Sequence, residues 1–426
     1  MEELIKFFIE VGKLKEIKRR GWLIRGIKSP ETVADHSFRV LILAFIFGLG
    51  TKMNIKRLLR IALFHSSSAV YIDYISPYDK VFEAKTKKEA LKKYPALLFR
   101  APYAKKEKIL KQRYEEEEKA IKELTQKLED PIKSEIIYLW QDFQHRTSRE
   151  AKFIYILDKL ENLIQALEYK DQLDKELIKP FLLQIREITN DKNILSLVDS
   201  LDAHFTKGED KIKSRKDKNL IRFILQVGKL KVTPRRGWVL RGVKNPESIA
   251  SHCFRMALMG YVFSGRKRLD RTVVLEMALF HDLFASVIGD VTPYDRIASL
   301  VKDKSKLFET LPWMGVSESK KVIVLKNLEK EVGALDKVIS GLPHNLKHEI
   351  KYLWLEYKTG GSKEARFARQ VDRIEGVIQA MEYYQRNKTT PVKAFWLELK
   401  ELIDDPLLSN FVEHLDFYFL QGNKRK

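Results

Sequence analysis

The sequence predicts an all-α protein made of two tandem helical units that arose by internal duplication. Apolar residues recur at spacings of three and four almost throughout, as in LIRFILQVGKL (220–230) and KRLLRIALFH (56–65), and alternating strand patterns are scarce. One segment also occurs twice: VGKLKEIKRRGWLIRGIKSPE (11–31) matches VGKLKVTPRRGWVLRGVKNPE (227–247). A repeat of roughly 200 residues is too long for a solenoid and indicates two whole domains.

The two copies can be followed along most of the chain. ALFH occurs at 62–65 and 278–281, and IIYLWQDF (136–143) pairs with IKYLWLEY (350–357). We expect a first domain over 1–206 and a second over 219–426, joined by the charged segment KGEDKIKSRKDK, in which apolar periodicity lapses. The duplication favours an intramolecular pseudo-dimer of the two domains.

Local signals predict where one helix of each copy begins. Ser29 and Asn245 each precede a proline, Pro30 and Pro246, and this pair of residues is typical of a capping side chain followed by the first helical position. We therefore expect helices that begin at these prolines and carry a histidine about two turns in.

Composition limits the classes of protein that fit. The 426 residues include 79 Lys and Arg against 58 Asp and Glu, which gives a net charge of +21 and favours polyanions or phosphorylated small molecules as partners. A helical surface rich in salt bridges explains the same charge. The single cysteine, Cys253, excludes a disulfide framework, and no secretory or membrane-spanning signal is found, so we expect a cytoplasmic protein with no membrane partner.

Histidine and aspartate residues that recur in both copies are candidates for a metal site. Two imidazoles and two carboxylates from separate helices can hold one divalent cation, with a preference for Mn, Co, Fe, Ni or Zn over Ca or Mg. Each residue taken alone is equally compatible with a structural histidine or a polar helix face. The recurring residues are His36, His65 and Asp158 in the first copy and His252, His281 and Asp372 in the second, which alone adds Asp282.

Three separated motifs of the second copy resemble the HD-domain metal-dependent phosphohydrolases, and most of all the small HD-domain 5′-deoxynucleotidases. They are PRRGWVLRGVKNPESIASHCFRMA (234–257), ALFHDLFASVIGDVTPYD (278–295) and QVDRIEGVIQAMEY (370–383). The resemblance implies a helical HD fold in both copies and one divalent metal ion in the second domain. The implied metal ligands are His252, His281, Asp282 and Asp372.

The resemblance also implies substrate contacts. Arg235, Arg236 and Trp238 would hold a nucleotide, since guanidinium groups grip phosphate and an indole packs against sugar or base. Asp290 would contact sugar or water near the metal and, with Asp282, take part in catalysis. The alternative places Trp238 in the core and the arginines in solvent.

The chain departs from the family pattern in both copies. Active relatives carry a glutamate three positions after the HD aspartate, where this chain has Ala285 and Ala69, so Glu375 or water would have to replace its function. The first copy also has Ser66 in place of the metal-binding aspartate. We therefore expect little or no catalysis there, and either ligand binding or a supporting role for the degenerate site, which keeps His36, His65, Asp158, Arg19, Arg20 and Trp22.

Two functions follow from these observations. The first is a divalent-metal-dependent phosphohydrolase that acts on nucleoside 5′-monophosphates or a related phosphomonoester through the second domain. The alternative is a catalytically silent protein that binds nucleic acid or a nucleoprotein particle through its basic surface. Two segments favour the alternative. Basic and aromatic residues are mixed in KKYPALLFRAPYAKKEK (92–108), and basic residues gather in the terminal GNKRK (422–426).

Overall fold

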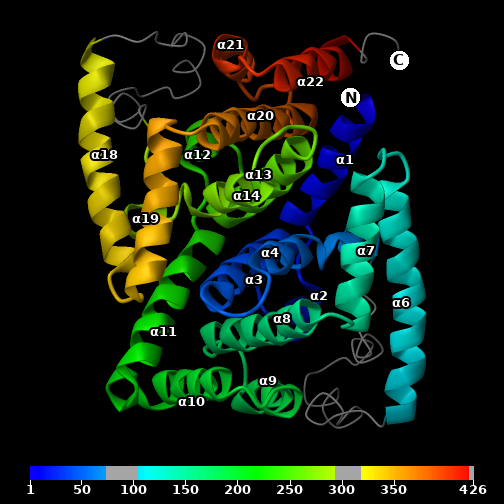
Figure 1. Ribbon diagram of the computed structural model, residues 1–426, viewed down its shortest axis with the longest axis vertical. Coiled ribbons are helices and arrows are strands. Elements are labelled where there is room, and N and C mark those ends of the chain that lie inside the picture. The colour runs from blue at the N-terminus through cyan, green and yellow to red at the C-terminus, as the bar shows by residue number, and fades with distance from the viewer. Residues whose placement is uncertain (73–102, 293–317, 422–426) are drawn as a thin grey trace. The chain divides into compact units, whose positions relative to one another are not determined.

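The structure is a computed structural model that describes residues 1–72, 103–292 and 318–421 (Figure 1). Within these ranges the chain forms helices and turns, and the only strand-like pairings are isolated bridges, Lys18 with Thr32 and Pro234 with Ser248. The all-α prediction is confirmed. None of the helices in the described residues is long and apolar enough to cross a bilayer.

The chain divides into two compact units whose bounds differ from the predicted domains at the amino terminus. The first unit is Lys13–Arg222, and the second unit combines Met1–Gly12 with Phe223–Lys426. Helix α1 (Glu2–Gly12) thus lies at the start of the first repeat in sequence but packs in the second unit, where the ring centroid of Phe8 lies 5.0 Å from that of Phe263 and 5.9 Å from that of Phe411.

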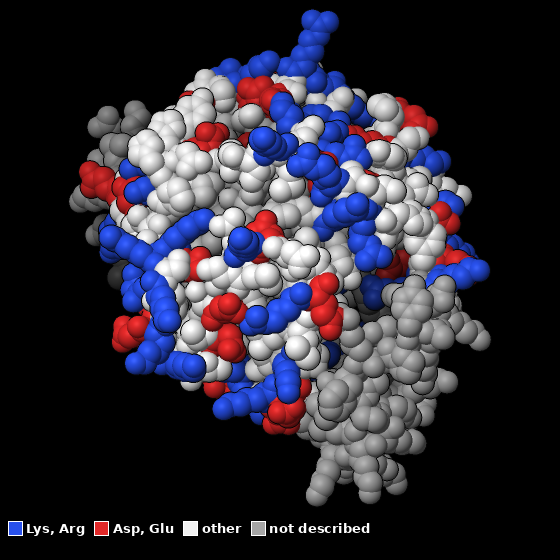
Figure 2. Space-filling model, turned by 60° about the horizontal axis from the view of Figure 1, so that its bottom comes forward, with Lys and Arg blue, Asp and Glu red and all other residues white. Residues whose placement is uncertain are grey.

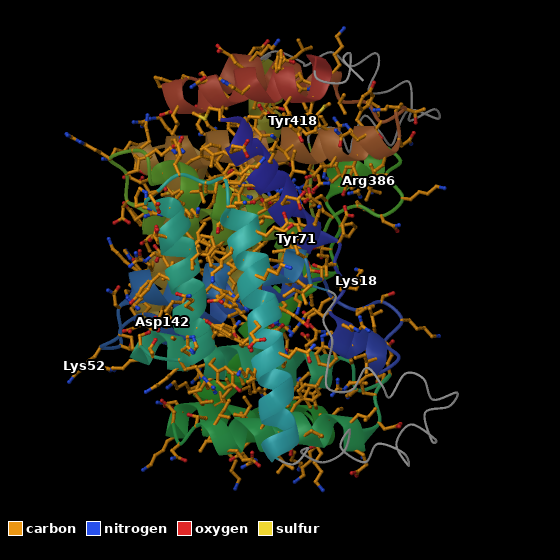
Figure 3. All side chains as sticks on the ribbon, turned by 90° about the vertical axis from the view of Figure 1, so that its right-hand side faces the viewer. Lys18, Lys52, Tyr71, Asp142, Arg386 and Tyr418 are labelled. Carbon is orange, nitrogen blue, oxygen red and sulfur yellow. The ribbon has the colours of Figure 1, made fainter. Side chains whose placement is uncertain are left out.

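The first unit places His36 on α3, His65 at the end of α4 and Asp158 on α8, three helices that pack on one another, while Arg19, Arg20 and Trp22 lie at the start of α2. Helices α6 and α7 run side by side next to them (Figures 1 and 3). Helix α11 (Arg215–Gly228) contains the boundary with the second unit. The other helices of the first unit are α2 (Arg20–Ile24), α3 (Val33–Gly48), α4 (Ile55–Phe64), α6 (Tyr103–Thr125), α7 (Ile132–His145), α8 (Arg149–Glu168), α9 (Lys175–Ile188) and α10 (Lys192–Lys207).

The second unit repeats this arrangement around α13, whose residues are all buried, as expected for a helix that is apolar on every side. Helix α13 packs on α14 and α20, and α18 runs beside α19 (Figure 1). The helices are α12 (Arg236–Leu240), α13 (Ile249–Ser264), α14 (Arg271–Phe280), α15 (Ala285–Ile288), α18 (Glu318–Ile339), α19 (His344–Thr359), α20 (Lys363–Arg386), α21 (Lys393–Leu402) and α22 (Pro406–Asp416).

The predicted helix starts at Pro30 and Pro246 are wrong. Helix α3 begins after the N-cap Thr32 and α13 after the N-cap Ser248, and each cap hydroxyl accepts a backbone N–H three residues on. The residues between proline and cap are extended because they pair with the chain at the start of the RRGW motif: Arg19 N, in the first residue of the motif, donates to Glu31 O over 3.0 Å. Each histidine therefore lies in the first turn of its helix, beside that motif.

Charged side chains of both signs share the described surface. On the face shown in Figure 2, Lys and Arg side chains alternate with Asp and Glu and with uncharged residues. Surface ion pairs such as Lys351 with Asp336, 2.7 Å apart, fit this mixed pattern. Residues 92–102 and 422–426, which carry much of the predicted nucleic-acid-binding feature, lie outside the described residues, so that role stays a prediction.

Candidate metal centre

His281 is oriented by the end of helix α14, of which it is the C-cap. Its Nδ1 lies 2.9 Å from Ala278 O, so the ring donates a hydrogen bond from Nδ1 and keeps the lone pair on Nε2. Trp354 Nε1 donates to the backbone oxygen of His281 over 3.1 Å. These two contacts fix the direction in which Nε2 points.

His252, in the first turn of α13, is oriented by a buried carboxylate. Its Nδ1 lies 2.5 Å from Glu375 Oε2, and the other oxygen of Glu375 accepts from Arg255 Nε over 2.8 Å. The three side chains are fully buried. A carboxylate behind the Nδ1 atom of a histidine is a common support for a metal ligand, because it leaves Nε2 free to coordinate.

The four predicted metal ligands lie together in the second unit. Nε2 of His281 is 3.3 Å from Asp282 Oδ2, and Nε2 of His252 is 3.2 Å from Asp372 Oδ1 on α20. The ligand atoms of His252, His281 and Asp282 all lie within 4.8 Å of one another. Apart from these two carboxylates, neither buried Nε2 atom has a hydrogen-bond partner among the residues that the structure describes. Buried polar atoms without a partner are rare and call for an explanation, and a cation between these atoms provides one.

The electrostatics of this cluster favour a positive charge at its centre. Burial raises the pKa of Asp282, but His281 and Arg235 lower it more strongly, and for Asp372 the neighbouring His252 likewise outweighs burial, so both pKa values lie below the usual range. Burial and Arg235 lower the pKa of His252, yet Glu375 and Asp372 raise it to about 9.

The residues predicted to hold substrate are divided between the cluster and the core. Arg235 Nη1 donates to Asp282 Oδ2 over 2.8 Å, and Arg236 contributes its backbone N–H, which donates to Asp290 Oδ2 over 2.6 Å. Burial raises the pKa of Asp290, and Asp282 adds to the shift. Arg235 and Asp290 therefore lie at the margin of the metal cluster.

Trp238 lies away from this margin. Its side chain is 3% exposed, its ring stacks on Phe395 with centroids 4.9 Å apart, and its Nε1 donates to Glu247 Oε1 over 2.8 Å. The indole nitrogen is thus used inside the protein. This position is the one that the core alternative describes, and contact with a nucleotide stays a prediction.

Two residues, Tyr357 and Glu375, hold the predicted ligands in place, and the sequence analysis did not assign them this role. Tyr357 Oη donates to Asp372 Oδ2 over 2.7 Å, and Glu375 lies behind His252 rather than beside its free nitrogen. The glutamate three residues after the aspartate occurs in both copies, as DKLE (158–161) and DRIE (372–375). Tyr357 is matched by Phe143 in the first copy, so it is a point where the two copies differ. Ala285, at the position of the family glutamate, is buried and offers no carboxylate.

The first unit has a similar cluster, in which the ligand atoms of His36, His65 and Asp158 also lie within 4.8 Å of one another. His36 Nε2 lies 3.4 Å from His65 Nε2 and 2.9 Å from Asp158 Oδ1. Ser66, at the position of Asp282, supplies no carboxylate. Burial and the neighbouring His36 lower the pKa of His65 to about 4.

The remaining residues of the predicted degenerate site are held within the first unit. Arg19 Nη1 donates to Asn162 Oδ1 over 2.6 Å and to Glu31 Oε1 over 3.1 Å. Trp22 repeats the position of Trp238, since its Nε1 donates to Glu31 and its ring stacks on Phe181. Arg20 is half-buried at the first position of α2.

Comparisons with known proteins agree with this architecture. The sequence matches the HD domain at residues 11–195 and again at 227–401. It is 32% identical over 198 residues to the mouse 5′-deoxynucleotidase HDDC2, covering 46% of this chain and 86% of the mouse protein. The match to the human 5′-deoxynucleotidase HDDC2 is 34% over 166 residues, or 39% of this chain and 69% of the human protein. A conserved hypothetical protein of known structure from Pyrococcus furiosus is 26% identical and aligns over 46% of this chain and 97% of its own, with a TM-score of 0.34. The chain belongs to the HD-domain family, of which it carries two copies in tandem.

Proposed function

We propose that the second unit is a divalent-metal-dependent phosphohydrolase that acts on nucleoside 5′-monophosphates or a related phosphomonoester. The observation that carries this proposal is the pair of buried Nε2 atoms, of His252 and His281, which face the carboxylates of Asp372 and Asp282 and have no other hydrogen-bond partner in the described part of the chain. Imidazole nitrogens and carboxylates together suit Mn, Fe, Co, Ni or Zn. The substrate class comes from the relatives named 5′-deoxynucleotidase.

The four ligands fit one divalent cation in charge as well as in atom type. Two carboxylates, of Asp282 and Asp372, balance two positive charges, and both have lowered pKa values, chiefly because the adjacent histidines outweigh burial. When bound, such a cation supplies a water of lowered pKa and neutralises charge on phosphoryl oxygens.

The side chains around the ligands have separate tasks in this proposal. Arg235 is partly exposed and has five N–H donors, of which Nη1 holds Asp282, so the guanidinium can orient that ligand and meet a phosphoryl oxygen at the same time. Asp290, held by the backbone N–H of Arg236, contacts the sugar or a water at the margin of the cluster. Glu375 and Arg255 orient His252 from behind.

The proton that the departing sugar oxygen needs has no donor at position 285. Loss of a general acid or base lowers a rate by about 10²- to 10⁴-fold, so we expect slow turnover rather than none. Glu375 is an unsuitable substitute because both of its oxygens bond to His252 and Arg255 on the side away from Nε2. Water is the remaining donor in this proposal.

The test is phosphate release by the full chain, loaded with Mn²⁺ or Co²⁺, from a panel of ribo- and deoxyribonucleoside 5′-monophosphates. We expect metal-dependent release that is lost in His281→Ala and kept in His65→Ala, the same change in the other repeat. No release from any nucleotide, or equal rates for both variants, would end the proposal.

A further inference from the structure

The two copies differ at positions around their clusters, and these differences decide what each cluster can bind. Five pairs are in question, and all of them lie in described residues. In order along the chain the first-unit residue and its second-unit counterpart are Ser66 and Asp282, Phe143 and Tyr357, Lys159 and Arg373, Asn162 and Gly376, and Gln184 and Glu398.

In the first unit the carboxylate of Asp158 has both of its oxygens occupied by nitrogen atoms of the protein. Oδ1 lies 2.9 Å from His36 Nε2, and Oδ2 accepts from Lys159 Nζ over 2.6 Å. In the second unit the corresponding oxygen, Asp372 Oδ2, accepts instead from the neutral hydroxyl of Tyr357. Phe143 has no hydroxyl group, and in the first unit the ammonium group of Lys159 donates the corresponding hydrogen bond.

The ammonium group of Lys159 can bond to Asp158 because the first unit lacks the second carboxylate that pairs with the counterpart arginine, Arg373. In the second unit, Arg373 Nε points to Glu398, with 3.4 Å between Nε and Oε1. The first unit has Gln184, which carries no charge, at the position of Glu398. Lys159 lies over the ring of Tyr155 instead, 4.9 Å from its centroid, and reaches the ligand carboxylate.

The arginine before the RRGW tryptophan is also held differently. Arg235 donates to Asp282, whereas Arg19, with Ser66 in place of that aspartate, donates to Asn162 over 2.6 Å. A glycine, Gly376, occupies the position of Asn162 in the second unit, and a Cβ atom there would meet no heavy atom within 4 Å. At this position the second unit therefore has open space where the first has the amide of Asn162.

The charge of the ligand residues determines whether each cluster can bind a divalent cation. The second cluster places two ligand carboxylates around its two histidines, which suits a divalent cation. The first cluster has one ligand carboxylate, and Lys159 already neutralises it. A cation entering there would meet no net negative charge from its ligands and would have to displace a bonded ammonium group.

We infer that the first unit binds no divalent ion, because Lys159 supplies there the positive charge that the ion supplies in the second unit. This inference rests on the proposed function, because it takes the second cluster to be a metal site. The first cluster is then not a weakened metal site. Lys159 occupies its carboxylate, and the two histidines and Asp158 have a structural role.

Metal content of the full chain tests the inference without reference to activity. The protein is stripped with a chelator, reloaded with excess Mn²⁺, freed of unbound metal by gel filtration and analysed for Mn per chain. We expect about one ion per chain from a single complete ligand set, the same value in His65→Ala, and almost none in His281→Ala. About two ions in the unmodified chain, or a loss of metal in His65→Ala, overturns the inference.

A reverted variant tests the role of the lysine directly. It combines Ser66→Asp, Phe143→Tyr, Lys159→Ala and Asn162→Gly, and we expect it to gain one further ion, which His65→Ala in the same background removes. Ser66→Asp alone, with Lys159 in place, should gain none. A reverted variant that keeps the circular dichroism of the parent but binds no additional Mn²⁺ overturns the role of Lys159.

These outcomes separate the inference from the proposed function. An unmodified chain that binds no Mn²⁺ contradicts the proposed metal site of the second unit. Gain of an ion by the reverted variant from that starting point would still support the role of Lys159, and failure to gain one would contradict it.

Discussion

A single hydroxyl separates Tyr357 from its counterpart Phe143, and it bonds directly to a ligand carboxylate, Asp372, over 2.7 Å. We predict that Tyr357→Phe weakens binding of Mn²⁺ about 10- to 100-fold, as loss of a hydrogen bond to a metal ligand commonly does. Titration of the stripped protein measures the affinity. Tyr352→Phe, on the same helix but 50% exposed, is the control and should leave the affinity unchanged. Equal affinities for the two variants would show that Tyr357 does not orient Asp372.

The residues that the structure brings together in the second cluster were predictable at this scale, since two histidines and an aspartate recur in order in both copies and Asp282 follows His281. Their orientation was not. Glu375 looks from the sequence like part of a polar face, and only the fold brings it to Nδ1 of a histidine 123 positions away. Trp238 shows the opposite case: an indole beside two arginines suggests a binding surface, but Glu247 and Phe395 hold it inside.

Helices α7 and α8 meet at a corner that depends on one buried carboxylate. Asp142, labelled in Figure 3, lies in the last turn of α7 and accepts from Thr147 Oγ1 over 2.6 Å and from Ser148 N over 2.9 Å, while Ser148 caps α8. Arg57 from α4 donates to its other oxygen over 2.6 Å. Burial raises the pKa of Asp142, but the bonds from Ser148, Thr147 and Arg57 lower it further, to about 2.

The sign of the pH dependence follows from this lowered pKa. Because the pKa in the folded protein lies below the ordinary aspartate value of about 3.9, the ionised carboxylate stabilises the fold above about pH 4, and this contribution is lost as the pH falls toward 2. We predict that Asp142→Asn costs on the order of 2 kcal/mol at pH 7 and progressively less below pH 4. Urea unfolding across this range measures it. Asp199→Asn, which removes an exposed ion pair with Arg186, should cost little at any pH, and a constant gap for Asp142→Asn would contradict the prediction.

Helix type was easier to predict than helix starts. The three-to-four spacing of apolar residues identifies helices reliably because it records which face is buried. The starts at Val33 and Ile249 were missed because proline after a polar residue also occurs in extended segments, and here pairing with the chain at the start of the RRGW motif holds residues 30–32 extended. A local signal cannot report a backbone pairing that depends on a distant segment.

At the scale of the whole chain, duplication was visible in the sequence but the assignment of α1 was not. MEELIKFFIEVG (1–12) and KNLIRFILQVG (218–228) have nearly the same apolar pattern, so either could pack in either unit. The structure places α1 in the second unit, where Gly12 allows the guanidinium of Arg255 to approach its backbone closely. Helix α1 therefore lies against Arg255, the residue whose Nε bonds to Glu375 behind His252.

Because the chain contains two copies, the effect of restoring the missing glutamate at position 285 can be compared with the same change at position 69. Ala285 and Ala69 occupy the same buried position, three residues after Asp282 and after Ser66 respectively. If the second unit hydrolyses phosphomonoesters slowly because it lacks a proton donor, Ala285→Glu should raise kcat about 10²-fold, at the low end of what a general acid contributes. Ala69→Glu should leave kcat unchanged, because no metal ion is expected beside it.

Steady-state phosphate release at saturating Mn²⁺ measures both variants, and their metal content shows whether the added carboxylate coordinates the ion instead. A higher rate at constant metal content supports proton transfer as the slow step in the parent chain. If Ala285→Glu folds, holds its metal and releases phosphate no faster than the parent, the low rate has another cause, and the idea that the second site lost only its proton donor fails. An equal gain in Ala69→Glu would instead mean that the first unit is active.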